Sequence, residues 1–176
     1  MYLYNTLTKQ KEKLEKKEIK MYVCGVTVYD RPHLGHALST ITFDVLHRFL
    51  EYIDFKVIRV QNFTDVDDKI IAKSKELKIS PKEVAEKYIK AFFEDMDRLG
   101  VRRADVHPRA TQDMKEIIQL INNLIDRNAA YELNGSVYFD VSFSKDYGKL
   151  SRRNPNDLIE GNRIENEPDK KSSGDF

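Results

Sequence analysis

The spacing of apolar and polar positions predicts strand, helix and strand in the first part of the chain. Short apolar runs at 19–24 and 55–60 are typical of buried strands. Between them, residues 33–53 place apolar side chains mostly three and four positions apart, which predicts a helix. We expect its buried face to comprise Leu38, Ile41, Val45, Leu46, Phe49, Leu50 and Ile53. We expect its solvent face to carry His47, Arg48 and Glu51. This order predicts parallel strands joined by a right-handed crossover.

Two further helices and a hairpin are predicted downstream. Ser80 and Glu83 form a capping box with Pro81 at the first helical position, and Gly100 ends that helix. Its expected buried stripe is Tyr88, Phe92, Met96 and Leu99. A helix at 111–128 should pack through Met114, Ile117, Ile118, Ile121, Leu124 and Ile125. Asn134-Gly135 between two short strand-like runs within 131–141 predicts a β-hairpin.

The remaining segments are polar. Residues 1–7 fit a short edge strand or arm, residues 8–18 a charged, solvated turn, and residues 146–176 a loop. We therefore divide the chain into an α/β part at 1–112 and a smaller α+β part at 113–176. His107, on a loop beside a proline, is interpreted as structural.

Composition adds limits on compartment and partners. The 176 residues are 40% hydrophobic and 34% charged, a balance typical of a globular protein. A net charge of +1 gives no overall attraction to nucleic acid, so any such contact would need local patches. The single cysteine rules out an internal disulfide and fits a reducing compartment. Without a membrane-length apolar run or a signal-peptide core, the sequence predicts a cytoplasmic protein without membrane contact.

The candidate chemistry lies where the first strand turns into the first helix. His33 and His36 are three positions apart, so both rings would lie on one helix face at its positive end. Their ring N–H groups could stabilise charge on a phosphate in a transition state. Gly35 between them leaves room for an adenine ring or ribose near the backbone. The alternative is a turn with two solvated or capping histidines.

Longer segments resemble one family, cysteinyl-tRNA synthetase, a class I aminoacyl-tRNA synthetase. The resemblance covers nearly the whole chain and rests on residues 24–30, 32–37, 43–46, 60–71 and 170–176. It implies the first half of a Rossmann-like parallel sheet with helices, forming the amino-terminal half of the nucleotide-binding domain. It also implies that residues 113–176 begin a connective-peptide insertion. Val26 departs from the family, where proline is common.

The resemblance also implies roles for individual residues. His33 and His36 would be catalytic and would bind Mg-ATP together with Gly35 and Tyr29. Gly25, Thr27 and Thr64 would border the cysteine substrate. Cys24 would be one ligand of an active-site Zn²⁺, which would select cysteine because zinc prefers sulfur. For Thr64 the alternative role is to cap the next helix, whose positive end would favour Asp65, Asp67 and Asp68.

Several functional interpretations remain open. By resemblance the chain is the amino-terminal portion of a cysteine–tRNA ligase that forms cysteinyl-adenylate and charges tRNA(Cys), in a complete enzyme that is monomeric. The other family zinc ligands, the Lys-Met-Ser-Lys-Ser loop and the anticodon-binding region do not occur in these residues, so we expect this chain alone to be inactive and to associate through its exposed sheet edge. The alternatives are a ligase that joins cysteine to an amino sugar, a non-catalytic nucleotide-binding remnant, and a small nucleotidyltransferase.

Overall fold

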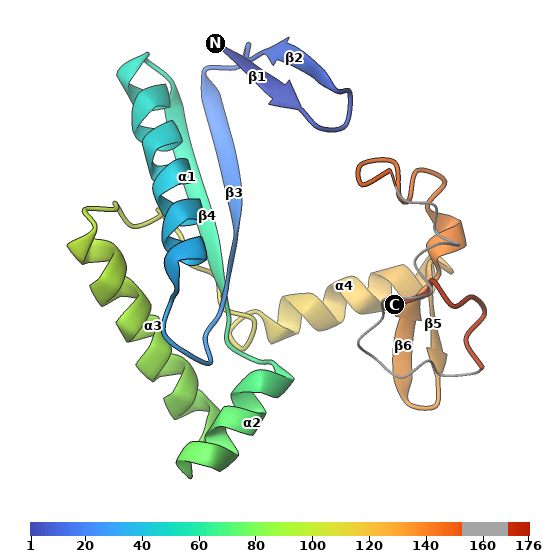
Figure 1. Cartoon of the computed structure of the whole chain (residues 1–176). Coiled ribbons are helices and arrows are strands. Elements are labelled where there is room, and N and C mark those ends of the chain that lie inside the picture. Colours follow the sequence, from blue (N-terminus) through green and yellow to red (C-terminus); the bar gives the residue numbers. More distant parts are fainter. Residues whose placement is uncertain (153–168) are drawn as a thin grey trace. The chain divides into compact units, whose positions relative to one another are not determined.

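The computed structural model describes residues 1–152 and 169–176 (Figure 1). The chain forms two compact units: Glu15–Met114, and Met1–Leu14 together with Lys115–Phe176. Residues 153–168, which belong to the predicted loop at 146–176, lie outside the described residues. Among the helices of the described part, none is both long enough and apolar enough to cross a membrane.

The larger unit is built on two parallel strands. Strands β3 (Glu18–Thr27) and β4 (Lys56–Thr64) pair in parallel, and helix α1 (Leu34–Tyr52) connects them, which confirms the predicted crossover. Both strands are longer than predicted. Strand β3 continues through Gly25. The ladder shifts register between Val23 and Val26, and this β-bulge accommodates the glycine without ending the strand.

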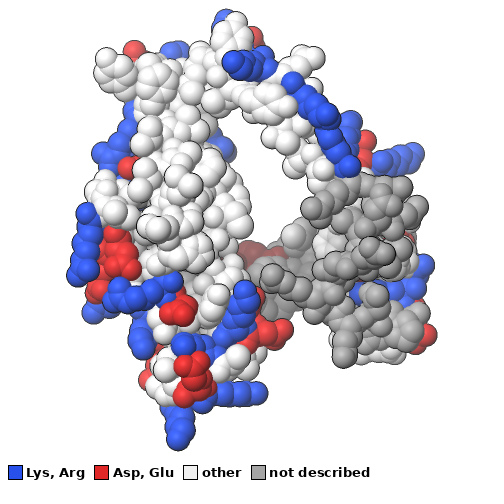
Figure 2. Space-filling view, viewed as in Figure 1, with Lys and Arg blue, Asp and Glu red and all other residues white. Residues whose placement is uncertain are grey.

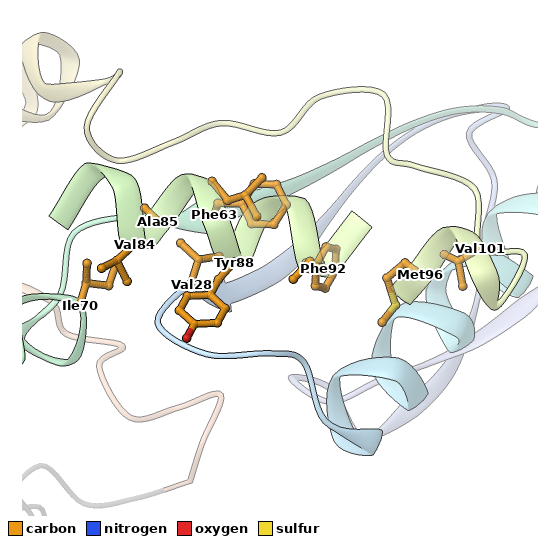
Figure 3. Packing of buried hydrophobic residues seen from close by; sticks show 11 residues of the cluster. Val28, Phe63, Ile70, Val84, Ala85, Tyr88, Phe92, Met96 and Val101 are labelled. Atoms are coloured by element: carbon orange, nitrogen blue, oxygen red, sulfur yellow. The ribbon is translucent and has the colours of Figure 1, made fainter. Parts of the chain in front are cut away.

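Alternate residues of β4 are buried, and the last of them, Phe63, belongs to the main core. Phe63 is 1% exposed and packs edge-on against Phe92, with ring centroids 5.4 Å apart. Phe92 belongs to helix α3 (Pro81–Arg98), which follows the shorter helix α2 (Asp68–Leu77). Figure 3 shows the cluster, which comprises Val28, Phe63, Ile70, Val84, Ala85, Tyr88, Ile89, Ala91, Phe92, Met96 and Val101. The core therefore lies where α2 and α3 meet the carboxyl ends of β3 and β4.

The predicted capping box of α3 is confirmed. Ser80 Oγ accepts from the Glu83 backbone N–H at 3.2 Å, and Glu83 Oε2 accepts from the Ser80 N–H at 2.8 Å. Tyr88, Phe92 and Met96 are buried as predicted. Leu99 was wrongly placed in the same stripe: it is 53% exposed, because it follows the last helical residue and turns with Gly100.

Helix α1 departs in part from the predicted faces: Arg48 and Glu51 are exposed as predicted, but His47 is buried and much of the predicted apolar face is exposed. His47 is 1% and Asp44 5% exposed, whereas Leu38 is 70% and Val45 59% exposed. Leu50 is the one residue of the predicted apolar face that is fully buried; Leu46 and Ile53 are half-buried. The physical reason is Arg59 on β4, 2% exposed, whose guanidinium lies against α1 and needs a carboxylate partner.

The outward face of α1 is consequently an apolar stripe. It consists of Leu34, Leu38, Ile41, Val45, Phe49 and Tyr52, all exposed. In Figure 2 a broad area without Lys, Arg, Asp or Glu covers this helix and the adjacent strands. A continuous exposed apolar surface of this kind is typical of an interaction surface or of an aggregation-prone one.

Leu38→Glu combined with Val45→Lys should leave the fold of this chain intact. Both side chains are mostly exposed, so the free energy of unfolding should change by no more than about 0.5 kcal/mol. Self-association, measured by sedimentation velocity across a concentration series, should decrease. A loss of several kcal/mol in urea unfolding would contradict the exposed placement of this stripe.

The amino-terminal residues form a hairpin of their own. Strand β1 (Tyr2–Asn5) pairs antiparallel with β2 (Gln10–Lys13), with Lys9 at φ 58° in the turn. Of the two expectations for residues 1–7, a short strand or an arm, the structure has the strand. The prediction of a solvated turn over 8–18 is wrong for Gln10–Lys13, because backbone pairing with β1 satisfies a segment whose side chains all remain in solvent.

Helix α4 (Met114–Asp126) forms within the predicted range but buries none of its residues. Met114 is 45% and Ile118 52% exposed, whereas the other four residues of the predicted face are half-buried, so the expected packing is observed only in part. Its apolar spacing reports an amphipathic helix correctly, yet spacing cannot show whether another element covers that face.

The Asn134-Gly135 hairpin is confirmed. Strands β5 (Ala130–Leu133) and β6 (Ser136–Phe139) pair around Asn134 and Gly135, both with positive φ, and a short 3₁₀ turn (Val141–Phe143) follows. Asp175, 1% exposed, fastens the last residues to this hairpin: it accepts from Tyr131 Oη at 2.7 Å and from the Val141 N–H at 3.0 Å. This aspartate lies in the segment that sequence alone assigns to loop.

Candidate nucleotide and amino-acid site

The candidate residues on the two strands lie side by side. Thr27 and Thr64 are partners in the parallel ladder, and the Val28 N–H donates to the Thr64 carbonyl at 3.2 Å. Thr27 and His36 also line the same small cavity of about 10 Å³. The strand ends and the histidine turn therefore belong to one site at the carboxyl edge of the sheet, as expected for an open α/β fold.

Gly25 lies where the two strands come closest. Its N–H donates to Asn62 Oδ1 at 2.8 Å, and the same oxygen accepts from Tyr22 Oη at 2.9 Å. A Cβ at position 25 would lie 1.5 Å from the Asn62 carbonyl oxygen. Only glycine fits here, so this residue is required by the strand pair before any substrate is considered.

Sequence reasoning placed Asn62 in the family segment but gave it no role. Its side chain bridges β3 and β4, and its Nδ2 also reaches Thr64 Oγ1 at 3.5 Å. A polar residue two positions after the end of the predicted strand at 55–60 was the available signal. Asn62 thereby orders the backbone around Gly25 and the hydroxyl of Thr64.

The two histidines cap α1 with their own rings. His33 is the N-cap residue, and its Nδ1 accepts from the Gly35 N–H at 3.0 Å. The His36 Nδ1 accepts from the His33 N–H at 3.2 Å, so the pair forms a reciprocal capping box. The rings stack with centroids 3.8 Å apart and planes inclined by 20°.

This geometry determines where the ring protons lie. A neutral imidazole carries one N–H, and an Nδ1 that accepts a hydrogen bond cannot carry it. In their neutral forms both rings therefore carry the proton on Nε2 and present an N–H donor away from the backbone. Capping and phosphate binding, which the sequence left as alternatives, are compatible because they use different nitrogens.

Gly35 has a local reason to lack a side chain. A Cβ there would lie 2.9 Å from His33 Cε1 and 3.0 Å from its Nδ1. The ring can move only by giving up its cap on the Gly35 N–H. Gly35 thus allows the histidine ring to fold over the first turn of α1, whether or not a ligand also approaches it.

Three of the four histidines resist protonation in the fold. The pKa of His36 is below its ordinary value chiefly because of burial and secondarily because of the His33 charge. Burial is also the main cause of the lowered pKa of His47, 1% exposed, and of His107, whose Nδ1 donates to the Gln61 carbonyl at 2.8 Å. His107 stacks on Phe63 at 5.3 Å, in keeping with the structural role expected for it.

Lowering the pH from 7.5 to 5.5 should destabilise the chain. In the unfolded state the histidines have their ordinary pKa of about 6.5. The folded state lowers the pKa of three of them, so the unfolded state binds more protons as the pH falls. Stability is therefore full above the unfolded pKa and declines as the pH falls through it. Urea unfolding at both pH values measures the loss, and His107→Gln should make it smaller. Equal stabilities at both pH values would contradict the burial of these rings.

The acidic residues after β4 have two structural roles: Asp67 caps helix α2, and Asp65 forms a clip, a pair of hydrogen bonds to Thr111. Helix α2 begins at Asp68, and its cap is Asp67, which accepts from the Lys69 N–H at 2.9 Å. The alternative that Thr64 caps this helix is wrong, because Thr64 lies three positions before the cap residue Asp67. Asp65, 8% exposed, accepts from the Thr111 N–H at 3.0 Å and from its hydroxyl at 2.5 Å.

A cavity of about 620 Å³ opens beside this clip. It is lined by the starts of α2 and α3 and by the segment around Thr111, with Ile70, Ile71 and Ala85 on its apolar side. No sequence pattern indicated this cavity, since it depends on where two helix starts and a distant loop meet. Its lining includes Asp65, which follows the last residue of β4.

Tyr29 is half-buried between the strand end and α2. The Lys69 ammonium lies 5.1 Å from the centre of its ring, a cation–π contact. Tyr29 also packs against the apolar core. These contacts keep the residue at the edge of the crevice.

Cys24 alone does not make a metal site. Its thiol is exposed on β3, three residues before Thr27, and zinc sites of the structural type need four protein ligands. Within residues 1–152 and 169–176 no group of three or more His, Cys, Asp or Glu side chains could hold a metal ion. The described residues thus offer one suitable sulfur donor and do not complete a zinc site.

Comparison with known proteins finds similar sequences over nearly the whole chain. The family model for the tRNA synthetases class I (C) catalytic domain matches residues 10–176. A protein from Clostridioides difficile named cysteine–tRNA ligase is 52% identical over 100% of this chain and 38% of its own length. A protein of the same name from Thermococcus gammatolerans is 50% identical over 99% of this chain and 37% of its own length. The chain thus spans little more than a third of these relatives.

Solved structures support the fold independently. A putative arginyl-tRNA synthetase from Campylobacter jejuni aligns with a TM-score of 0.57 at 12% identity, covering 77% of this chain and 40% of that one. The LeuRS of Agrobacterium radiobacter, solved in a ternary complex with tRNA and LeuAMS, aligns with a TM-score of 0.56 at 15% identity, covering 64% of this chain and 15% of that one. With a family model matched from residue 10 to the last residue, this chain belongs to the class I (C) tRNA synthetase catalytic domain family.

Proposed function

We propose that this chain provides the ATP- and cysteine-binding part of a cysteine–tRNA ligase. The observation that carries the proposal is the pair of stacked histidines at the start of α1, with both Nδ1 atoms committed to backbone N–H groups. Their free Nε2–H groups, next to a helix N-terminus, suit the phosphates of Mg-ATP. The relatives that match nearly the whole chain carry the corresponding name.

The histidines would act through hydrogen bonds and not through proton transfer. As the cysteine carboxylate attacks the α-phosphate, negative charge builds on the phosphate oxygens and pyrophosphate leaves. Donors already fixed in place stabilise that charge without reorganising. The depressed pKa of His36 favours a neutral donor at pH 7. Gly35 and Tyr29 would border the adenosine.

Gly25, Thr27 and Thr64 would border the amino-acid substrate. Their placement at the paired ends of β3 and β4 supports this assignment, since Thr27 and Thr64 are ladder partners. Cys24 lies on the same strand and is exposed, so its thiolate could serve as one zinc ligand with further ligands from outside the described residues. A bound zinc would supply selectivity for a thiol over a hydroxyl.

We also propose a division of the chain into two structural parts. We assign residues 1–112 to the amino-terminal half of the Rossmann-like catalytic domain and residues 113–176 to the start of a connective-peptide insertion. The parallel pair β3–β4 supports that division, and so does the unit boundary between Met114 and Lys115, although the unit that contains Lys115–Phe176 also includes Met1–Leu14. The partners would be ATP, cysteine and tRNA(Cys) in the cytoplasm. By itself the chain would associate through the edge of β3 and the apolar stripe of α1.

Pyrophosphate exchange tests the proposal. The complete polypeptide that contains this sequence is purified and assayed for exchange of labelled pyrophosphate into ATP with each standard amino acid. Exchange that depends on cysteine, and is at least about a hundredfold weaker with serine, is the expected result. Exchange with another amino acid, or none with cysteine, would overturn it. Transfer of cysteine to an amino sugar and not to tRNA would instead favour the related ligase.

A further inference from the structure

A buried guanidinium ties the histidine-bearing helix to strand β4. Arg59 is 2% exposed, its Nη1 lies 3.4 Å from Asp44 Oδ1, and its Nη2 donates to the Arg102 carbonyl. Asp44 lies midway along α1 and is 5% exposed. Removing Asp44 would leave the buried Arg59 charge without its ion-pair partner, and removing Arg59 would leave the buried Asp44 with Arg48 alone; both changes are unfavourable. Each residue therefore fixes the position of the other.

The strand side of this tie is held in place by backbone hydrogen bonds. The Arg59 N–H donates to Asp105 Oδ2 at 2.6 Å, and its carbonyl accepts from the Asp105 N–H at 2.9 Å. The same strand ends at Thr64. Arg59 is thus rigidly connected to the end of β4 that borders the proposed amino-acid site.

The helix side is held by charged contacts of the same kind. Arg48 donates from Nε to Asp44 Oδ2 at 2.8 Å and from Nη2 to the Gly100 carbonyl at 3.1 Å. One turn further, Glu51 accepts from Arg102 Nη2 at 2.8 Å and lies 3.2 Å from His47 Nε2. Charge-assisted hydrogen bonds have stricter geometry than apolar packing, so this face allows one setting of α1.

We infer that Arg59 is a positioning residue, which acts through Asp44 to place His33 and His36 at the right distance from Thr64. Asp44 and His36 are two turns apart on one continuous helix, so a rotation or slide of α1 would move both rings. The inference rests on the proposed function, because it takes the two histidines as the groups that meet the phosphates.

A double substitution separates positioning from stability. Arg59→Met alone leaves the buried Asp44 with Arg48 as its remaining charged partner and should lower the Tm. Adding Asp44→Leu replaces both charges by apolar groups, which is often neutral for stability, and should restore the Tm. If the tie positions α1, the double variant should still show kcat for cysteine-dependent exchange lowered about tenfold or more, with KM changed by less than about threefold. Arg103→Met, which removes an exposed arginine paired with Asp97, is the matched control and should leave both constants unchanged.

A second readout uses the chain described here. The ring C–H signals of His33 and His36 in NMR spectra, and the nuclear Overhauser contacts between these stacked rings, report their placement directly. They should shift in the double variant and remain unchanged in Arg103→Met. Recovery of Tm, kcat and ring signals together would overturn the inference, since it would leave Arg59 with a role in stability only.

The inference can also be tested if the double variant does not fold or if the unaltered protein lacks exchange activity. If the double variant does not fold, Arg59→Lys takes its place; it keeps the charge but loses the guanidinium fork, and unchanged histidine signals in it would overturn the inference. If the unaltered protein shows no cysteine-dependent exchange, the proposed function fails, while the ring signals still decide whether Arg59 positions the histidines.

Discussion

Replacing Gly25 by alanine is expected to destroy the pairing of β3 and β4. The new Cβ would lie 1.5 Å from the Asn62 carbonyl oxygen and 3.0 Å from its Oδ1, far inside van der Waals contact. The strands would have to separate at the bulge, which breaks the hydrogen bond from the Gly25 N–H to Asn62 Oδ1. We expect a loss of at least about 4 kcal/mol in the free energy of unfolding, from overpacking and the broken polar contact together.

Urea unfolding of the chain measures this loss, and another glycine provides the control. Gly135 has φ +79° and no heavy atom within 4 Å of a built Cβ, so alanine there meets backbone strain without any clash. Gly135→Ala should cost only about 1–2 kcal/mol. If both substitutions had equal and small effects, the close approach of the strands at Gly25 would be wrong.

His33→Asn is expected to remove catalysis while leaving the helix intact. Asparagine is a good N-cap residue, so its side chain can still accept from a backbone N–H of the first turn. It has no group at the position of the His33 Nε2. In the complete polypeptide, cysteine-dependent pyrophosphate exchange should fall by about tenfold or more, as for loss of one preorganised donor. Urea unfolding should change by less than about 0.5 kcal/mol.

His36→Asn and His33→Ala complete the comparison. The first should lower exchange to a similar degree, because the His36 Nε2–H is the second free donor. The second should lose the cap as well, at a further cost of about 1 kcal/mol in stability. Exchange that survives unchanged in both asparagine variants would show that the two rings serve the helix and not the phosphates.

Local chemistry was predictable from the sequence because it acts over a few residues. The capping box at Ser80 and Glu83, the turn at Asn134-Gly135 and the start of α1 at the histidines each depend on neighbours within four positions. The parallel pairing of β3 and β4 also followed, since a single helix joins them. For the site, this was enough to bring Thr27 and Thr64 to one edge.

Contacts between distant segments were not predictable in the same way. The buried face of α1 depends on Arg59, which is fifteen residues away along the chain from its partner Asp44. The clip between Asp65 and Thr111 spans forty-six residues, and the bridge from Gly25 to Asn62 spans thirty-seven. Periodicity treats each apolar position as core and each charged position as surface, so it fails where a strand presents a buried charge.

The buried and exposed sides of helix α1 should be under different evolutionary constraints. Substitutions of Asp44 and His47 should be selected against for folding, as core residues usually are, although both are polar. Substitutions of Leu38, Val45 and Phe49 should be neutral for folding and selected only through what the stripe contacts. In a deep mutational scan scored for abundance, α1 should therefore tolerate polar residues at its exposed apolar positions and reject apolar residues at its buried polar ones.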